Sequence, residues 1–290
     1  MHISVLLEPI LKYIKPNDKV FDGTFGGGGY TRAFLDKNCV CFASDLDQTA
    51  IDRFDNSSNK ITFFNLSFDE AIESFEDNFL DVAVVDLGYS SNQLDFSERG
   101  FSYQKLTENL DLRYNQNEGT PCFEKIRKLK TVEDLSRILY NYSGEEFSSR
   151  IAKALWGKNH TTVGQFVETI VSIIPAKFQK KKNSILSRIW QSLRIWTNRE
   201  FEALENFLAI SVAKIKVGGL LMVVDFHSLE DKIVTKFMRN LAKPVETDDF
   251  GNKQKKFEFL TPKGILPTAL EIENNIRSRS ATLRILKRLV

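Results

Sequence analysis

Short apolar runs at an even spacing constrain the fold of this chain more than any other feature of its sequence. They lie at 19–22 (KVFD), 40–45 (VCFASD), 60–65 (KITFFN) and 81–88 (DVAVVDLG). Short apolar strands that alternate with helix-compatible segments predict a parallel sheet covered on both faces. A sheet of this kind binds its ligands at the carboxyl ends of its strands. Each run ends in a polar residue, which is in order Asp22, Asp45, Asn65 and Asp86.

The same alternation returns near the end of the chain. The run GGLLMVVDFHS (218–228) predicts another buried strand, and Ser228 with Asp231 is expected to cap the helix that follows. The segments KFEFL (256–260) and ATLRILKRL (281–289) are interpreted as a closing antiparallel pair. Together these runs predict an α/β fold of the Rossmann-like class, with a mostly parallel sheet and a closing antiparallel strand.

The middle of the chain has a different pattern. No run there resembles a buried strand, whereas TVED (131–134) and TVGQ (162–165) resemble the capping boxes that begin helices. Apolar residues follow at a helical period, and Pro175 is expected to end the second of these helices. We therefore expect an α/β domain made of residues 1–107 and 184–290. An α-helical domain, residues 108–183, is inserted between these two parts.

Composition excludes several functional classes. The formal net charge of +2 does not identify a class of binding partner. The local basic runs, such as 177–182 and 253–256, are either solvated surface or anion-binding segments. Three cysteines make neither a disulfide framework nor a metal-ligand pattern, and three histidines exclude a His-rich metal site. No window approaches the ~20 apolar residues of a membrane span, and no signal peptide is recognisable. We expect a cytoplasmic protein without a metal.

Four glycines, Gly26 to Gly29, follow the first predicted strand and open the first predicted helix. Glycines allow positive φ and let a ligand approach the main chain, and a helix N-terminus adds exposed N–H groups. Such a loop binds a diphosphate or a carboxylate. A P-loop is excluded because no lysine follows the glycines, and a dinucleotide site would have a third glycine where Thr31 stands.

S-adenosyl-L-methionine is the remaining cofactor, and two acidic residues suit it. Asp22 ends the first strand and commonly supports such a loop, and Asp45 ends the second strand, where a carboxylate can accept both ribose hydroxyls. NAD would use the same carboxylate, so Asp45 alone does not discriminate between the two cofactors. A glycine-rich turn that binds no ligand also remains open.

The loop after the fourth strand favours methyl transfer to an amine. Its sequence is DLGYSSNQLD, with Asp86 at the strand end beside the expected cofactor. The exocyclic amine of cytosine or adenine is conjugated with its ring and is a poor nucleophile. An acceptor must hold its N–H and direct the lone pair at the methyl group. Asp86 or a neighbouring backbone carbonyl is expected to do this.

At this point the motifs resemble those of one family, the MraW (RsmH) family, over nearly the whole chain. The most specific motifs are DLGYSSNQLDFSERGFS (86–102) and FHSLED (226–231). The resemblance implies a class I S-adenosylmethionine-dependent methyltransferase fold. It also implies methylation of the N4 amine of a cytidine in the decoding region of small-subunit (16S-type) ribosomal RNA, with the helical insertion helping to hold the RNA. The family's cofactor-binding residues fall on Gly28, Gly29, Tyr30, Asp45, Phe68, Asp86 and Gln93.

The chain departs from the family pattern at several positions. Tyr30 stands where the loop usually ends in histidine, and Leu46 replaces an arginine. Ser4 replaces a proline near the start, and Asp225 replaces a serine before FHSLED. The usual GPLDMRMD has become ENLDLRYN (108–115). These changes keep an alternative open, namely a catalytically impaired homologue that acts as an RNA-binding ribosome-assembly factor.

Three residues are expected to act in catalysis. Asp86 anchors the cofactor edge and orders the amine, and Tyr89 stacks on a flipped base unless it only packs within its loop. His227 bonds to the base or a phosphate unless it only precedes a helix cap, and Phe68 stacks on adenine unless it belongs to the core. Candidates for contact with RNA phosphates are Arg99, Arg113, Arg194, Arg277 and Arg279. The expected partner is small-subunit ribosomal RNA or the assembled subunit, and a homodimer is left open.

Overall fold

The computed structural model describes residues 4–54, 60–88, 98–247 and 253–290. The chain divides into two compact units, one made of Met1–Gly88 with Glu202–Val290 and the other of Tyr89–Phe201. The helical insertion expected at 108–183 lies inside the second unit, whose bounds are wider on both sides. The reason is that Phe101 before it and helix α10 (Lys182–Asn198) after it pack into the core of that unit.

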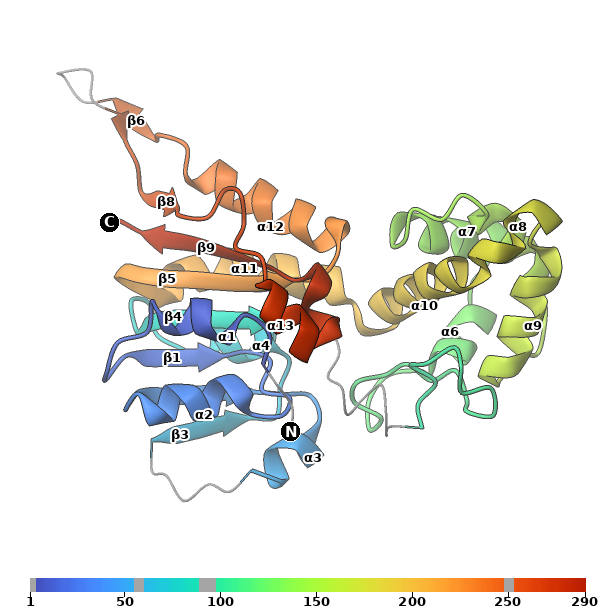
Figure 1. The fold of residues 1–290 in the computed structure, drawn as a ribbon, viewed down its shortest axis with the longest axis horizontal. Helices are drawn as coiled ribbons and strands as arrows, with labels where there is room; N and C mark the ends of the chain where they lie inside the picture. Colours follow the sequence, from blue (N-terminus) through green and yellow to red (C-terminus); the bar gives the residue numbers. More distant parts are fainter. Residues whose placement is uncertain (1–3, 55–59, 89–97, 248–252) are drawn as a thin grey trace. The chain divides into compact units, whose positions relative to one another are not determined.

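Seven strands of the first unit form one sheet in the order β3-β2-β1-β4-β5-β9-β8 (Figure 1). Their bounds are β1 Lys19–Asp22, β2 Val40–Ser44, β3 Ile61–Phe64, β4 Leu80–Asp86, β5 Ile215–Asp225, β8 Phe257–Phe259 and β9 Thr282–Arg288. β1 to β5 are parallel, and β9 is antiparallel to both of its neighbours. The predicted fold class is therefore confirmed, including the closing antiparallel pair. A separate two-stranded ladder joins β6 (Glu246–Thr247) to β7 (Lys253–Gln254).

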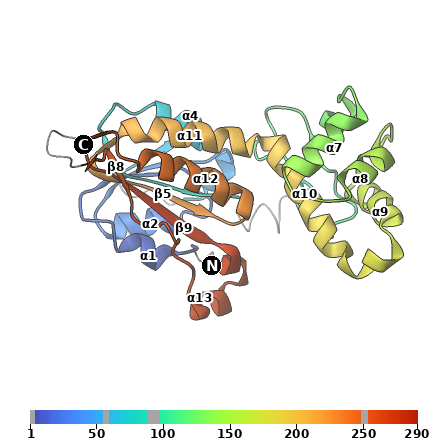
Figure 2. The same ribbon diagram turned by 90° about the horizontal axis from the view of Figure 1, so that it is seen from above.

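Helices cover both faces of this sheet because its central strands are apolar on both faces (Figure 2). Along β1 the side chain of Val20 packs with Phe34, whereas Phe21 packs on the opposite face with Phe207. The helices on the first face are α1 Leu7–Leu11 and α2 Gly29–Asp36. Those on the second face are α4 Phe68–Glu73, α11 Glu200–Lys214 and α12 Ser228–Leu241. The unit also contains α3 Gln48–Asp52, α13 Ala269–Asn274 and the 3-10 helix η2 Ile276–Ser280.

The second unit is helical, as the absence of buried strand patterns predicts. Its elements are α6 Cys122–Arg127, α7 Val132–Asn141, α8 Ser148–Leu155, α9 Val163–Ile173, the 3-10 helix η1 Ala176–Lys181, and α10. Both predicted capping boxes are confirmed, at Thr131 before α7 and at Thr162 before α9. α9 ends two residues before Pro175, whose ring prevents the helix from continuing. In the part of the chain that is described, no helix is long and apolar enough to span a membrane.

Candidate cofactor-binding site

The loop between β1 and α2 is held at the carboxyl edge of the sheet by the two strands that flank β1. Gly23 N–H donates to the Val84 carbonyl of β4 at 2.9 Å. Phe25 N–H donates to the Ser44 carbonyl of β2, also at 2.9 Å. These bonds carry the main chain across the edge of the sheet and place the glycines beside the ends of all three strands.

Two of the glycines are required by close contacts. Gly28 has φ +73°, and a Cβ there would lie 2.9 Å from the ring of Phe25. A Cβ at Gly29 would lie 1.9 Å from Ser4 Oγ, so the N-terminal segment packs against the start of α2. Gly28 is the N-cap residue and has no side chain with which to cap the helix. Since the first N–H groups of a helix lack intrahelical partners, this bare main chain suits a carboxylate or a phosphate.

Asp45, just beyond the end of β2, is bound to the glycine loop. Its Oδ2 accepts a hydrogen bond from Gly26 N–H at 2.7 Å, and its Oδ1 accepts one from Asp47 N–H at 2.8 Å. Asn65, the residue after β3, donates to the Asp45 carbonyl at 2.9 Å. The carboxylate is thus fixed in position at the edge of the sheet by two backbone donors.

Asp22 at the end of β1 is a buried carboxyl that organises the loop. Its Oδ2 accepts from Thr31 Oγ1 at 2.7 Å, and its Oδ1 accepts from Thr24 N–H at 3.3 Å. Burial raises the pKa of Asp22 to about 6, against the effect of these two hydrogen bonds, and Asp45 adds to the rise. Thr31, which is absent from the sequence-based site, therefore has a role: it holds this carboxyl from α2.

Asp86 at the end of β4 has an unsatisfied oxygen. Its backbone N–H donates to Thr24 Oγ1 at 2.7 Å. Its Oδ1 is buried and has no hydrogen-bond partner among the residues that the structure describes. Burial, followed by the nearby carboxyls of Asp22 and Glu230, holds the pKa of Asp86 well above its usual range. A buried acceptor without a partner costs free energy, so its presence favours a ligand that completes the site.

The rings of Phe68 and Tyr30 pack against other side chains of the protein. Phe68 begins α4 next to the loop, since a Cβ on Gly23 would lie 2.8 Å from Phe68 Cβ, and its ring packs edge-on against Phe207 with centroids 5.5 Å apart. The ring of Tyr30 is buried in the core, and its hydroxyl donates to the Val5 carbonyl. What Tyr30 offers to a ligand is therefore its main-chain N–H at the start of α2, because its ring is directed into the core.

His227, not Ser228, is the N-cap residue of α12, which corrects the predicted cap. The Glu230 N–H donates to His227 Nδ1 at 3.3 Å, and Glu230 Oε2 accepts from His227 N–H at 3.3 Å. Asp231, the other half of the predicted cap, instead accepts from Arg284 Nε at 2.8 Å. The cap lies one residue earlier because the imidazole nitrogen accepts the hydrogen bond that a serine hydroxyl was expected to accept.

Asp225 at the end of β5 is a second buried carboxyl with an unsatisfied oxygen. Its Oδ2 has no hydrogen-bond partner within the described ranges. Burial raises the pKa of Asp225 to about 8, with smaller contributions from Asp231 and Glu230, while Arg284 lowers it. Alternation along the strand places this side chain on the α12 face, together with Val223, and not on the α2 face with Asp86.

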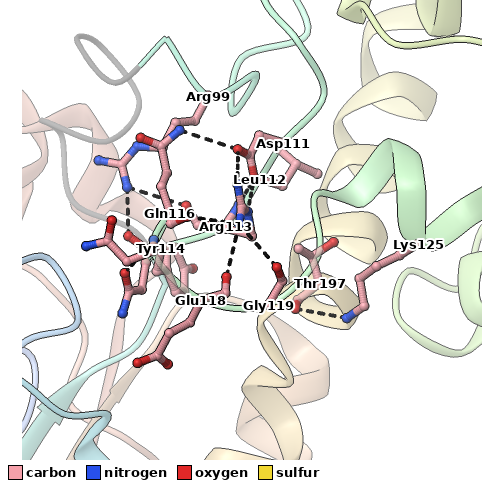
Figure 3. Close-up of polar contacts among 12 residues, drawn as sticks. Arg99, Asp111, Leu112, Arg113, Tyr114, Gln116, Glu118, Gly119, Lys125 and Thr197 are labelled. Atoms are coloured by element: carbon pink, nitrogen blue, oxygen red, sulfur yellow. Dashed lines mark hydrogen bonds and ion pairs between the residues drawn. The ribbon is translucent and has the colours of Figure 1, made fainter.

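Three of the five arginines expected to contact RNA are held by internal contacts in the second unit. Arg113 pairs with Asp111 at 2.6 Å and also donates to the carbonyls of a following loop (Figure 3). Arg99 donates to the Tyr114 carbonyl at 2.7 Å. Arg194 is buried and pairs with Glu200 at 2.9 Å. These guanidinium groups stabilise their own unit, which leaves less of each for an external phosphate.

The other predicted site residues divide into two groups. Arg277 and Arg279 lie on η2 and are exposed to solvent. Tyr89 and Gln93 lie outside the described residues. Sequence reasoning did not select Thr24, Thr31 or Glu230. For the two threonines the available signal was a hydroxyl residue within or just after the glycine loop, but only the fold shows which carboxyl each one serves.

Comparison with known proteins adds independent information. The sequence model of a family described as the MraW methylase family matches residues 1–289. A ribosomal RNA small subunit methyltransferase H from Ehrlichia canis (strain Jake) is 34% identical over 303 residues and is covered over 100% of both chains. The protein of the same name from Clostridium botulinum (strain 657 / Type Ba4) is 36% identical, with 99% of each chain covered. Among solved structures, an rRNA methylase from Streptococcus thermophilus matches over 100% of this chain and 99% of its own at 12% identity, with a TM-score of 0.42.

Proposed function

The chain belongs to the MraW methylase family, and from that premise we propose that it methylates the N4 amine of a cytidine in the decoding region of small-subunit ribosomal RNA. Membership makes it a methyltransferase whose cofactor is S-adenosylmethionine, which removes NAD as an alternative. Relatives named ribosomal RNA small subunit methyltransferase H support ribosomal RNA as the substrate. The N4 amine is inferred from the motif resemblance and from the chemistry of the site.

The residues at the sheet edge fit this cofactor. The uncapped start of α2 suits the carboxylate of its methionine part, and Asp45 suits the ribose hydroxyls. The partnerless oxygen of Asp86 suits a polar group at the third strand end, and Phe68, which begins α4 next to the glycine loop, remains the proposed neighbour of the adenine. When bound, S-adenosylmethionine supplies a methyl group on a positively charged sulfur.

Asp86 is the residue that we assign to the target amine. Its free oxygen accepts the amine N–H and so directs the nitrogen lone pair toward the methyl group. The Asp86 N–H donates to Thr24 Oγ1 at 2.7 Å. This bond sets where the Asp86 carboxyl lies relative to the glycine loop. The proton that the amine loses has an acceptor in the Asp86 carboxylate. Tyr89 remains the proposed stacking residue for a flipped base.

We place RNA binding on the second unit and on the exposed Arg277 and Arg279 of η2. Both arginines are exposed to solvent, and exposed guanidinium groups are the usual contacts of RNA phosphates. A substrate of small-subunit ribosomal RNA, or of the assembled subunit, supports our proposal that the protein acts in the cytoplasm.

The single observation that carries the proposal is the partnerless Asp86 oxygen beside an uncapped glycine loop in a chain of this family. The test is nucleoside mass spectrometry of small-subunit ribosomal RNA from cells with and without the gene. We expect N4-methylated cytidine to disappear in the deletion strain and to return with the wild-type gene but not with Asp86→Asn. Unchanged N4-methylated cytidine in the deletion strain would contradict the proposal. Cofactor binding without methylation would favour the assembly-factor alternative.

A further inference from the structure

Every exposed charged residue of helix α12 is basic. These residues are Lys232, Lys236 and Arg239, and the exposed Lys243 follows directly after the C-cap of the helix. Spacings of four and three residues place the first three on one side of the helix, whereas Val234 on the other side packs into the core. At the rise of an α-helix the four cations extend over roughly 16 Å. We call Lys232, Lys236, Arg239 and Lys243 the basic face of α12.

The acids of α12 do not neutralise this face. Glu230 is buried, and its carboxylate accepts hydrogen bonds from backbone N–H groups. Asp231 accepts from Arg284 Nε at 2.8 Å, so its charge is balanced from β9. Within the described part of the chain none of the four cations forms an ion pair, and the Lys243 ammonium donates to the uncharged Oδ1 of Asn240 at 2.9 Å. The four positive charges can therefore act on a partner outside the chain.

The stability of the helix does not account for this arrangement. Lys232 and Lys236 are four residues apart, and like charges at this spacing destabilise a helix. A helix that binds a membrane surface has apolar residues beside its cations, whereas the other exposed residues of α12 are Ser228 and Asn240. A row of cations without acidic or apolar neighbours fits a partner that carries many negative charges and no apolar surface.

The exposed charges of the neighbouring helices have the opposite sign. α4 and α11 cover the same face of the sheet as α12 (Figure 2). Their exposed charged residues are all acidic, Glu70 and Glu73 on α4 and Glu202 and Glu205 on α11. A net charge of +2 for the whole chain does not reveal this separation. Separated charge steers a polyanion to one side of a protein, which here is the side of α12.

The basic face begins at the edge of the sheet that carries the candidate site. β5 ends at Asp225, and α12 begins three residues later at Ser228. Val224 of β5 pairs in register with Asp86 of β4, so the start of α12 lies at the same edge as the proposed acceptor for the target amine. A strand of RNA that places its base at Asp86 can therefore continue along the basic face.

At its far end the basic face is extended by a second basic segment. Val245 N–H donates to the Gln254 carbonyl at 2.9 Å, which joins the segment leaving α12 to the run 253–256. Lys255 and Lys256 follow that bond and are exposed. This basic run, which the sequence left open as solvated or anion-binding, thus lies beside the end of α12 that carries Lys243.

We propose that the basic face of α12 binds the phosphate backbone of the ribosomal RNA segment that flanks the target nucleotide. The inference rests on the proposed function, because that function takes RNA as the substrate. Phosphate contacts fix the position of a nucleic acid without reading its sequence. The basic face thereby holds the RNA while the target base enters the site at Asp86.

The test measures the affinity for transcribed small-subunit ribosomal RNA by filter binding over a range of KCl concentrations. The variant carries Lys232→Gln, Lys236→Gln, Arg239→Gln and Lys243→Gln, because glutamine keeps the helix propensity of lysine and arginine. Each phosphate contact of a single strand adds about 0.7 to the steepness of log affinity against log salt, so the variant should lose about 3 of that slope. From about 50 to 200 mM salt, the wild-type affinity should then fall roughly 50-fold more than that of the variant. The affinity for S-adenosylmethionine, measured by calorimetry without RNA, should not change.

A matched pair of double variants separates a local contact from an effect of net charge. Lys236→Gln with Lys243→Gln removes two exposed lysines of the basic face. Lys12→Gln with Lys15→Gln removes two exposed lysines at the end of α1 and in the segment before β1. The first pair should lower the slope by roughly 1.4, and the second should leave it as in the wild type. Equal slopes for the two double variants would overturn the inference.

The same experiment separates this inference from the proposed function. An unchanged slope in the quadruple variant, with RNA bound by the wild type, would overturn the inference alone. If the wild type forms no N4-methylated cytidine on RNA that it binds, the result contradicts the proposed function, while a reduced slope in the variant still supports the inference. A wild-type protein that binds no RNA would overturn both.

Discussion

A buried ion pair of the second unit and two buried carboxyls at the sheet edge of the first unit differ in whether the fold satisfies them. In the second unit Arg194 donates to both oxygens of Glu200, at 2.9 and 3.0 Å, so each charge has its partner. At the sheet edge of the first unit, Asp86 Oδ1 and Asp225 Oδ2 are buried without a partner among the described residues. A satisfied pair stabilises its own fold, whereas an unsatisfied atom costs free energy until a ligand completes it. Charged residues in equally specific motifs therefore differ in role according to whether the fold already satisfies them.

Replacing the unsatisfied carboxyl should have the largest effect on activity and a small effect on folding. Asp86→Asn keeps the size of the side chain but cannot become a carboxylate, so it cannot take the amine proton. We expect the single-turnover rate of methyl transfer to ribosomal RNA to fall by roughly 10²- to 10⁴-fold, the usual range for a lost acid–base group. The urea midpoint should stay the same or rise. A rate within threefold of the wild type would remove Asp86 from the proposed role.

Replacing a satisfied arginine should show the reverse pattern. Arg194→Ala leaves the Glu200 carboxylate half-buried without its main partner, and we expect a loss of about 3 kcal/mol in the free energy of unfolding, measured in urea. Cofactor affinity should not change. Arg137→Ala is the control, because Arg137 pairs with Asp134 at the surface and should affect stability very little. Equal losses from both variants would mean that burial does not distinguish the two pairs.

Asp22 tests the same contrast through pH. Its pKa is about 6 in the folded chain against a reference of 3.8, so the folded state binds the proton more tightly than the unfolded state. This acid therefore favours folding most below about pH 4, and its contribution is lost as the pH rises through 6. The linkage amounts to at most about 3 kcal/mol for this fully buried group. Asp22→Asn should cancel that slope, since Thr31 can accept from the amide, and the difference between the two pH curves isolates Asp22. Parallel curves would contradict the raised pKa.

The parts of the fold that the sequence predicted correctly are those with local signals. The run KVFD gives the bounds of β1 because an apolar stretch that ends in a polar residue is a complete strand signal. Thr131 and Thr162 were predictable as caps because threonine followed three residues later by an acid or amide is a common capping pattern. The α12 cap was misplaced because histidine is not among the preferred N-cap residues, whereas Ser228 is.

The contacts of the polar side chains at and near the candidate site were not predictable, because the tertiary fold sets them. Thr31 counts in the sequence only as a missing third glycine, yet its hydroxyl binds Asp22 once α2 packs against β1. Arg113 and Arg194 are of the residue type that commonly binds phosphate, but the tertiary fold gives each of them an internal carboxylate partner. Asp225 ends a strand as Asp86 does, and only the register of β5 shows that its side chain lies on the other face of the sheet.

Two glycines with nearly equal backbone angles give the finest comparison of the two units. Gly28 in the cofactor loop has φ +73° and Gly157 in the helical unit has φ +72°. Substitution of either glycine by alanine should lower the free energy of unfolding by about 1 kcal/mol, because the left-handed conformation is unfavourable for a residue with a Cβ. A Cβ at Gly28 would also lie 2.9 Å from the Phe25 ring, whereas one at Gly157 would meet nothing within 4 Å among the described residues. We therefore expect Gly28→Ala to lose about 1 kcal/mol more in urea than Gly157→Ala, and only Gly28→Ala to weaken S-adenosylmethionine binding in calorimetry. Equal losses of stability and unchanged S-adenosylmethionine binding in both variants would show that the loop requires glycine for its positive φ and not for the approach of a ligand.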